Sequence, residues 1–495
     1  MPLLAVFNVV RHGTYHDSVT LMRLGSEIER VPGVTRAAAM MGTPANRALL
    51  AEAGLLAADG EAARPTDLVI AVVADTAATA ALAWQAADRA LARRPAEGRA
   101  SRDRSRTLTS ALQVLPDANL ALISVPGLYA AAEATRALAA GLHVMVFSDN
   151  VPLEDEIRLK RTARERGLFV MGPDCGTALL GGVPLGFANA VPRGRIGIVA
   201  ASGTGLQAVS CHIAAADEGV SHAIGLGGRD LSDEVGGLML EPALEVLATD
   251  PDTAVICVIG KPPGPDTAKK IRVRLDALTK PWVTHFTGDP AGSTAATLED
   301  AALTAVALAR GERHRPVTFT RPASDVARLA ADAAAPLAPR QRYVRGVYAG
   351  GTLAQEAAAL LGTRVAAGGE GHRVVDLGDD AYTVGRPHPM IDGTLRREWI
   401  VREANDPATA VILLDVVLGY GAHADPVGEL LPAIERARAR PVAVVASVCG
   451  TDADRQGLGR QTDALRRAGV VVMPSNAQAA RLAGMIATRA GGGGS

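Results

Sequence analysis

The stretch GRIGIVAASGTGLQ, residues 194–207, decides the fold of this chain. Its apolar, β-branched run at 196–200 is typical of a buried parallel strand, and SGTG then turns the chain into an apolar-periodic helix that reaches about residue 217. A helix start presents unpaired N–H groups and the positive end of the helix dipole. The turn therefore predicts either an ordinary capped strand-to-helix connection or a phosphate site formed by Ser202, Gly203, Thr204 and Gly205.

Composition limits the classes of protein to which the chain can belong. The 495 residues are enough for about three domains, and 48% of them are hydrophobic, which supplies each domain with a core. A net charge of −1 and an aromatic content of 3% argue against nucleic acid as a partner. No apolar run reaches the roughly 18 residues of a membrane helix, and no secretory signal is recognisable, so we expect no membrane partner and a cytoplasmic location.

The cysteines indicate neither a disulfide framework nor a metal site. The four are Cys175, Cys211, Cys257 and Cys449, and they are widely spaced, without a CxxC pair or a cluster with histidines. Such a pattern suits a reducing compartment.

Alternating strands and helices organise the first part of the chain. Residues 1–93 run in the order β-α-β, α, β-α, which predicts a ferredoxin-like α+β domain. Residues 94–107 hold several arginines with Pro, Gly and Ser and almost nothing apolar, so they predict a linker. Residues 108–192 resume the alternation, and each strand ends in a small or polar loop residue, as in a Rossmann-like sheet.

The same alternation organises the rest of the chain. Residues 193–310 and 342–490 each predict a flavodoxin-like domain with an open parallel sheet. Residues 311–341 predict a second linker, and GGGGS at 491–495 is an appended linker outside the fold. The predicted fold class is therefore α/β, with a ferredoxin-like domain followed by Rossmann-like and flavodoxin-like parallel-sheet domains.

Motifs in the middle of the chain resemble a known enzyme. GPDCG at 172–176, the opening stretch, GLGGRD at 225–230 and DPDTAVICVIG at 250–260 look like the ligase domain of the succinyl-CoA synthetase α subunit. The resemblance covers roughly residues 108–310. It implies that the segment 108–192 is a truncated domain of the CoA-binding type.

Motifs in the C-terminal segment resemble the flavodoxin-like domain of the β subunit of the same synthetases. They occur in matching order and are AGGTLA at 349–354, VVDLGDD at 374–380, AVILLDVVLGYGAHADP at 410–426 and VVASVCGTD at 444–452. Both halves stand on one chain behind a ferredoxin-like domain and the loop YHDSVTLM at 15–22. The whole chain therefore resembles the FdrA family.

The resemblance implies a phosphate site built from two helix starts. In the synthetases, the helix after SGT and a helix after a glycine pair in the β domain point at one phosphate from two sides. Here the second helix start would be Gly419, Tyr420 and Gly421, and a third wall would be Gly350, Gly351 and Thr352.

The chain also departs from the synthetase pattern. THFTGDPAGSTAATLED at 284–300 replaces the Gly-rich loop of the phosphorylated histidine, so His285 stands at a strand end without that loop. Lys261 stands where the synthetases have the acid that holds this histidine, and it offers an anion ligand instead. An ATP-grasp domain, a GxxxxGK[ST] loop and the first CoA-seating unit are not recognisable, so we expect that this chain requires no cofactor of its own.

These features favour transfer of a carbamoyl group to and from phosphate. Members of the FdrA family are implied in oxamate carbamoyltransfer during allantoin breakdown, a branch of purine catabolism. The resemblance thus implies a carbamoyltransferase subunit that uses phosphate and carbamoyl phosphate, acts with other subunits and can form a homo-oligomer. The alternatives are an acid-thiol ligase subunit that binds CoA and takes ATP from a partner, and a scaffold without activity.

Such a transfer requires oxyanion ligands and a proton donor for the leaving group. For Cys175 the alternative is a small buried residue, and for the loop GRPHP a polar surface loop. We expect no metal ligands. The candidate catalytic groups are His423, Lys261 and His285, and the candidate substrate contacts are Asp174, Cys175, Arg386 and His388.

Overall fold

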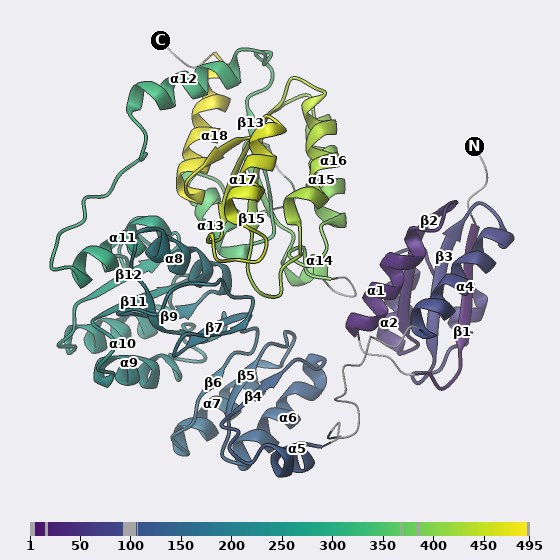
Figure 1. The fold of residues 1–495 in the computed structure, drawn as a ribbon, viewed down its shortest axis with the longest axis horizontal. Helices are drawn as coiled ribbons and strands as arrows, with labels where there is room; N and C mark the ends of the chain where they lie inside the picture. Colours follow the sequence, from purple (N-terminus) through teal and green to yellow (C-terminus); the bar gives the residue numbers. More distant parts are fainter. Residues whose placement is uncertain are drawn as a thin grey trace. The chain divides into compact units, whose positions relative to one another are not determined.

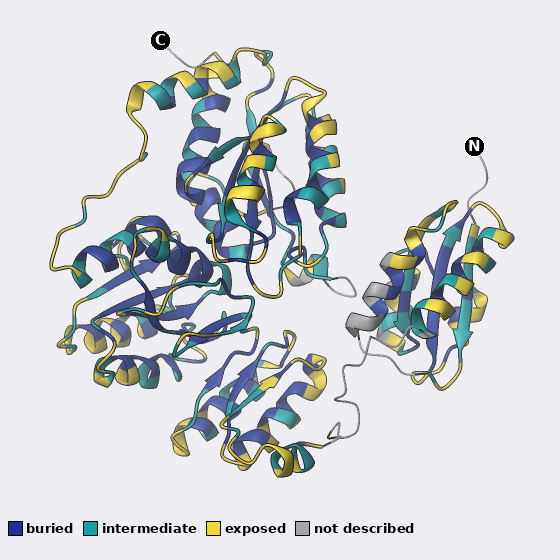
Figure 2. Ribbon diagram, in the orientation of Figure 1, coloured by how far each residue is buried: buried dark blue, intermediate teal, exposed yellow. Residues whose placement is uncertain are grey.

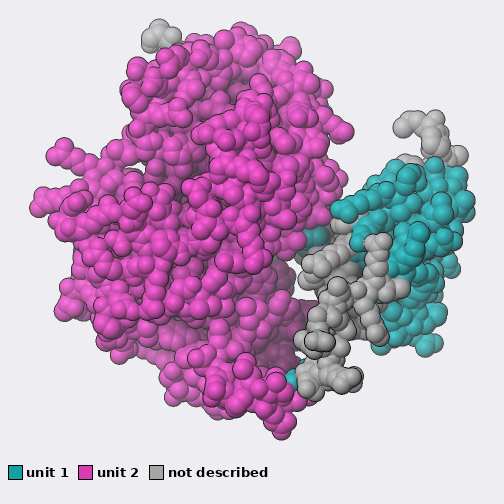
Figure 3. All heavy atoms as spheres, viewed as in Figure 1, with its two compact units in different colours: residues 1–106, 383–387 teal, residues 107–382, 388–495 magenta. Residues whose placement is uncertain are grey.

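The computed structural model describes residues 5–14, 18–92, 105, 107–366, 368, 370–383 and 387–492. The chain forms two compact units, residues 1–106 with 383–387 and residues 107–382 with 388–495 (Figure 3). Among the described residues, the first unit holds one antiparallel sheet and the second holds three further sheets (Figure 1).

The first unit is an α+β domain. Its sheet has the order β1-β3-β2 with antiparallel pairing, and the apolar, β-branched sequence LVIAVVA makes β3 the buried central strand. The elements follow one another in the order β-α-β-α-α-β-α, which agrees with the predicted α+β domain. The elements are β1 (Ala5–Arg11), α1 (Ser18–Glu29), β2 (Val34–Met41), α2 (Pro44–Glu52), α3 (Ala58–Glu61), β3 (Leu68–Ala74) and α4 (Ala77–Ala92).

The second unit begins with a small parallel sheet of order β4-β5-β6. The buried Nζ of Lys160 on α7 (Leu153–Glu165) lies 2.7 Å from Glu156 and 2.8 Å from Asp230, which follows strand β10 (Val220–Gly225) of the central domain. This buried ion network ties the small sheet to the central domain. The elements are α5 (Leu108–Val114), β4 (Leu120–Ile123), α6 (Gly127–Ala139), β5 (His143–Val146), α7 (Leu153–Glu165) and β6 (Val170–Met171).

The central domain is a six-stranded sheet of order β12-β11-β9-β10-β7-β8. Its strands β9 to β12 are parallel, and the hairpin β7-β8 adds an antiparallel edge. The elements are β7 (Thr177–Leu180), β8 (Val183–Gly186), β9 (Ile196–Ala201), α8 (Gly203–Ala215), β10 (Val220–Gly225), α9 (Leu240–Thr249), β11 (Val255–Gly260), α10 (Pro265–Asp276), β12 (Trp282–Phe286) and α11 (Leu298–Ala309).

The C-terminal domain has the parallel strand order β14-β13-β15-β16-β17, which is the 2-1-3-4-5 order of flavodoxin-like folds. The strand β15 is buried at all nine positions because its sequence, TAVILLDVV, is apolar on both faces. The elements are α12 (Ala323–Ala334), β13 (Tyr343–Tyr348), α13 (Gly351–Leu360), β14 (Arg373–Asp376), α14 (Asp380–Thr383), α15 (Thr394–Asn405), β15 (Thr409–Val417), α16 (Pro426–Arg438), β16 (Ala443–Cys449), α17 (Leu458–Arg467), β17 (Val471–Met473) and α18 (Asn476–Ala490).

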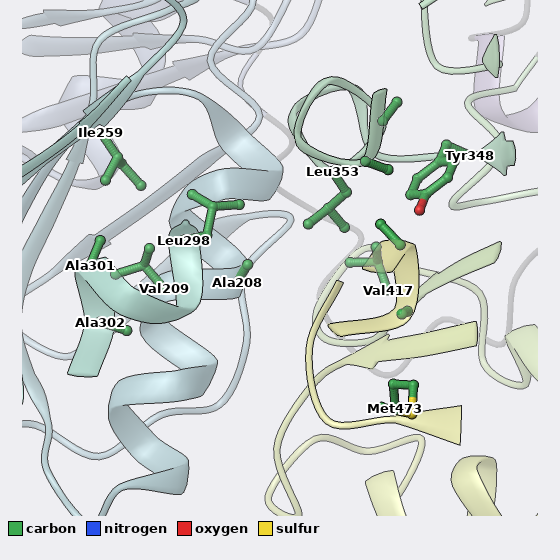
Figure 4. Packing of buried hydrophobic residues seen from close by; sticks show 14 of the residues in the cluster. Ala208, Val209, Ile259, Leu298, Ala301, Ala302, Tyr348, Leu353, Val417 and Met473 are labelled. Atoms are coloured by element: carbon green, nitrogen blue, oxygen red, sulfur yellow. The ribbon is translucent and has the colours of Figure 1, made fainter. Parts of the chain in front are cut away.

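One hydrophobic core joins the central and C-terminal domains. Residues of α8 and α11, such as Ala208 and Leu298, belong to the same buried cluster as Tyr348 and Leu353 of the C-terminal domain (Figure 4). Polar contacts supplement it: the carboxylate of Glu299 accepts hydrogen bonds from Ser475 and Gln478 across the boundary. Figure 2 shows the strands of these sheets buried and the outer helix faces exposed.

The structure confirms the predicted fold class and differs from the prediction in one connection. The sequence places residues 177–186 with the segment 108–192, whereas they form the hairpin β7-β8 on the central sheet. Gly181 and Gly182 supply the positive φ angles of its turn, so this glycine pair between two short apolar runs is the signal that could have identified the hairpin. Among the described helices, none combines the length and the hydropathy that crossing a membrane requires.

Candidate anion site

Two parallel sheets each contain a topological switch point. At such a point, the second and third strands in chain order lie on opposite sides of the first strand. In the central sheet this point lies between β9 and β11, and in the C-terminal sheet it lies between β13 and β15. Open α/β sheets bind ligands outside the carboxyl ends of the strands at such points. The helices that follow β9 and β13 are α8 and α13, so their N-termini are the first places to look for a ligand site.

The start of α8 is a capped glycine-rich turn. Ser202 is the N-cap residue, and its Oγ accepts a hydrogen bond of 2.9 Å from the Gly205 N–H. Gly203 opens the helix beside Thr177, because a Cβ at this glycine would lie 3.2 Å from the Thr177 hydroxyl. An α-helix leaves the N–H groups of its first turn without an intrahelical acceptor, so Gly203 and Thr204 can offer theirs to an anion.

A buried carboxylate, that of Asp415, fixes the backbone turn that precedes α13. Asp415 on β15 accepts hydrogen bonds from the backbone N–H groups of Ala349 (2.9 Å) and Gly350 (2.8 Å). Arg396 on α15 donates to Asp415 Oδ1 at 2.8 Å and to the carbonyls of Val347 and Asp415. The turn before α13 is therefore fixed, and the N–H groups of Gly351 and Thr352 on the first turn have no acceptor within the helix.

The two helix starts meet. The Oγ of Ser202 lies 2.5 Å from Oγ1 of Thr352, and a Cβ at Gly350 would lie 3.1 Å from the Thr204 methyl group. Residues 202–205 and 350–352 thus form one contact between the central and C-terminal domains, and the predicted third wall lies opposite the α8 start. The positive ends of two helix dipoles converge there.

The prediction of a helix start at 419–422 is wrong. The helix α16 begins at Pro426, and residues 419–422 form a turn in which two N–H groups already have acceptors: Gly419 donates to Gln456 Oε1 and Tyr420 to the Ala188 carbonyl. Gly419 and Gly421 have φ angles of 111° and 78°, and a Cβ at Gly421 would meet the Phe187 ring at 2.8 Å. These glycines serve a tight turn against the preceding domain, and replacing Gly421 would strain its backbone.

Asp376, at the end of β14, is a site residue that the sequence did not single out. Its Oδ1 accepts a hydrogen bond from the Gly378 N–H at 2.9 Å, and a Cβ at Gly351 would lie 2.6 Å from its Oδ2. Burial raises the pKa of Asp376 to about 7, while the hydrogen bond from Gly378 opposes this, the nearby carboxylates of Asp415 and Asp379 add to it and the Lys261 ammonium lowers it.

Lys261 and His388 approach the same place. Lys261 lies in the exposed loop after β11, and its charge acts on Asp376. His388 Nδ1 accepts the Met390 N–H at 3.2 Å, and a Cβ at Gly378 would lie 2.6 Å from its Nε2. Burial lowers the pKa of His388 to about 4, with a smaller contribution from Arg396, so the ring is neutral and carries its proton on Nε2.

The two predicted catalytic histidines, His285 and His423, have internal partners. His285 is buried on β12, where Nδ1 lies 3.1 Å from the Ala295 carbonyl and Nε2 lies 3.3 Å from the Thr287 hydroxyl. His423 is half-exposed, and its Nδ1 accepts the Asp425 N–H at 3.1 Å. Since α16 begins at Pro426, His423 does not stand on the first turn of a phosphate-facing helix.

The predicted substrate contacts lie in different settings. Burial raises the pKa of Cys175 to about 12, so the residue is a thiol packed under β10 and does not have the properties of a nucleophile. Asp174 beside it is exposed, and Thr177, which follows on β7, lies against the start of α8. Arg386 lies outside the described residues, so its predicted role stays a prediction. Among the described residues no group of three or more His, Cys, Asp or Glu side chains could hold a metal ion.

The C-terminal domain and the central domain each match a known family. Residues 347–486 match the family described as CoA-ligase, and residues 192–288 match the CoA binding domain. The chain belongs to the family of YahF, because "Uncharacterized protein YahF" of Escherichia coli (strain K12) is 40% identical over 507 residues, covering 96% of this chain and 97% of that protein.

Shorter parts of the chain are similar to subunits of ligases. The ADP-forming sulfoacetate-CoA ligase subunit SauD of Bilophila wadsworthia is 29% identical over 181 residues, which cover 34% of this chain and 60% of that protein. The mitochondrial ADP-forming succinate–CoA ligase subunit alpha-2 of Trichomonas vaginalis is 34% identical over 153 residues, 29% of this chain and 47% of that protein. A solved acetyl-coenzyme A synthetase 1 of Ca. Korarchaeum cryptofilum, in complex with phosphate and ADP, aligns over 76% of this chain and 83% of its own, with a TM-score of 0.30 at 16% identity.

The N-terminal unit matches a family whose description mentions a metal. Residues 4–107 match "AllF, heavy metal-associated domain", yet this segment contains no cysteine, and Cys175 is the first in the chain. Soft thiolates are the usual ligands of heavy metals. In the described part of the unit, His12 instead pairs with Asp67 at 3.0 Å. The residues present therefore do not fit a heavy-metal site.

Proposed function

We propose that the chain is a subunit of an acid-thiol ligase that moves an acyl group between phosphate and a thiol such as CoA. The observation that carries this proposal is the contact between Ser202 and Thr352, which joins two helix N-termini where a phosphate or an acyl phosphate can bind. The matches of residues 192–288 and 347–486 to CoA-related families support this class over the predicted carbamoyltransferase.

The nucleotide step belongs to a partner in this proposal. SauD and the succinate–CoA ligase α chain are named as subunits, and by resemblance a second protein would supply the ATP site. His285 is buried with both ring nitrogens engaged, so we propose no phosphohistidine on this chain. The phosphoryl group would reach the site as phosphate or acyl phosphate.

Carbamoyl transfer remains a second candidate because the same site chemistry serves it. The buried position of His285 favours phosphate itself as the reactant, and a carbamoyl phosphate has the same phosphate group as an acyl phosphate. The specific observation that favours carbamoyl transfer as the second candidate is the match of residues 4–107 to an AllF-type domain, given the resemblance of the chain to FdrA proteins.

Calorimetric titration of the purified full chain distinguishes an acid-thiol ligase subunit from a carbamoyltransferase subunit. An acid-thiol ligase subunit is expected to bind CoA and acetyl phosphate, whereas a carbamoyltransferase subunit is expected to bind carbamoyl phosphate and not CoA. In both cases Thr352→Val should weaken binding of the phosphate compound, and Thr249→Val, at an exposed position of α9, should not. Binding that Thr352→Val leaves unchanged would contradict the proposed site.

A further inference from the structure

The carboxyl group of Asp376 has one anchored oxygen and one that lies against the start of α13. The anchored oxygen is Oδ1, which accepts the Gly378 N–H, and Oδ2 lies so near Gly351 that a Cβ there would be 2.6 Å away. A residue held in this way keeps a fixed orientation toward the first turn of the helix. An inference about Asp376 therefore rests on the proposed anion site at the α8 and α13 starts.

Charged and titratable groups face Asp376 from several elements. Asp415 on β15, which pairs with Arg396 of α15, and Asp379 after β14 oppose its ionisation, and Lys261 after β11 favours it. His388 Nε2 lies near Gly378 beside Asp376 Oδ1, and its imidazole is neutral. Together with burial, these groups leave a carboxyl whose pKa of about 7 allows it to give and take a proton near neutrality.

We propose that Asp376 is the proton-transfer residue of the anion site, protonated when the anion binds and deprotonated when it hands its proton to the leaving group. In transfer from a thioester, an oxygen of HPO4²⁻ bonds to the carbonyl carbon and the carbon–sulfur bond breaks. The sulfur leaves with the proton of Asp376, and the carboxylate takes the proton of the attacking phosphate. The products are the acyl phosphate and the thiol, and the reverse reaction uses Asp376 as the base that deprotonates the thiol.

A purely structural role of Asp376 predicts a different pH dependence of anion binding than a role in proton transfer. If Asp376 only holds the turn at Gly378, an asparagine with the same carbonyl oxygen would serve equally well, and pH would not matter to anion binding. If Asp376 must be neutral beside an anion, the affinity for the anion falls as pH rises through about 7, because the carboxylate then repels it.

The test uses sulfate as the probe, because sulfate does not titrate between pH 6 and 8 as phosphate does. Sulfate binding to the full chain is measured by calorimetry across this range in two buffers of different ionisation enthalpy. We expect uptake of a proton on binding above pH 7 and an affinity that falls by up to about tenfold per pH unit there. Asp376→Asn should bind sulfate with little pH dependence and no proton uptake, while Asp463→Asn, a change of equal charge on the exposed face of α17, should behave as wild type.

The outcomes separate the two proposals. If wild-type protein binds no sulfate at any pH, the proposed anion site fails. If it binds sulfate without proton uptake, or if Asp376→Asn retains the uptake, the anion site stands and the role of Asp376 is overturned. Should the variant not fold, the wild-type proton uptake alone decides.

Discussion

The hydroxyl oxygens of Ser202 and Thr352, 150 positions apart in the chain, lie 2.5 Å from each other. Ser202 caps α8 on the central sheet, and Thr352 stands on the first turn of α13 on the C-terminal sheet. Because each helix follows the first strand at the switch point of its sheet, this contact brings two ligand-binding positions of α/β folds together. The domain boundary and the proposed anion site are therefore the same place.

Removing the buried hydroxyl of Thr352 should weaken anion binding and should destabilise the fold less than removing the hydroxyl of Ser202. Both changes lose the contact between the two hydroxyls. Thr352→Val keeps the shape of the side chain and removes one hydrogen-bonding group, which is worth roughly 1 kcal/mol, or about a fivefold loss of affinity. Ser202→Ala also removes the cap of α8 and should cost about 1 kcal/mol of folding free energy. Calorimetry with phosphate and urea unfolding of both variants measure the two effects separately. Equal loss of stability in both variants would contradict the role of Ser202 as the cap of α8.

Breaking the buried pair of Arg396 and Asp415 should destabilise the C-terminal domain strongly. Both side chains are nearly fully buried, and Arg396→Met leaves the Asp415 carboxylate without its cation. Loss of one partner of such a pair costs about 3 to 5 kcal/mol. The surface pair Arg466 and Asp463 provides the control, because Arg466→Met should cost less than about 1 kcal/mol. Urea unfolding measures both, and a small effect of Arg396→Met would mean that water reaches Asp415.

The stability of the chain should fall as pH rises from about 4 to 7 through the contribution of Asp376. Its pKa of about 7 in the folded chain lies above the value of 3.8 in the unfolded one, so between these values the folded state binds more protons. The contribution is lost as pH rises, and Asp376→Asn should be more stable than wild type at pH 8 by up to about 4 kcal/mol. Unfolding of the two proteins at pH 5 and pH 8 measures the difference, which should shrink at the lower pH. The reverse order would exclude a raised pKa.

His285 should not carry a phosphoryl group. Its two nitrogens contact Ala295 and Thr287 inside the central domain, so neither is presented to a substrate. After incubation of the chain with labelled nucleotide and its partner subunits, we expect no acid-labile label at this position. Labelled His285 would restore a phosphohistidine relay to the mechanism and would require β12 to open.

The sequence predicted the local parts of the site better than their assembly. SGTG after a β-branched strand predicted the capped start of α8, because capping is decided within a few residues. The resemblance to the synthetases wrongly predicted a helix start at Gly419, although Asp425 followed by Pro426 is the stronger start signal and is where α16 begins. Asp376 could not be identified, since its raised pKa depends on its burial and on the nearby carboxylate of Asp415, and only the folded chain supplies both.

Adding a methyl group at Gly205 should abolish anion binding. A Cβ at this position would lie 2.4 Å from the Ser202 Oγ and 3.2 Å from the Thr352 methyl group, so Gly205→Ala must displace the cap and separate the two helix starts. Gly459→Ala is the matched control, because Gly459 stands on the exposed first turn of α17 with no atom within 4 Å of the new Cβ. Alanine exceeds glycine in helix propensity by up to about 1 kcal/mol, so the control should be slightly stabilised and should bind phosphate as wild type does. Both variants are compared by thermal unfolding with and without phosphate. A shift of the melting temperature by phosphate that survives in Gly205→Ala would mean that the anion binds elsewhere on the chain.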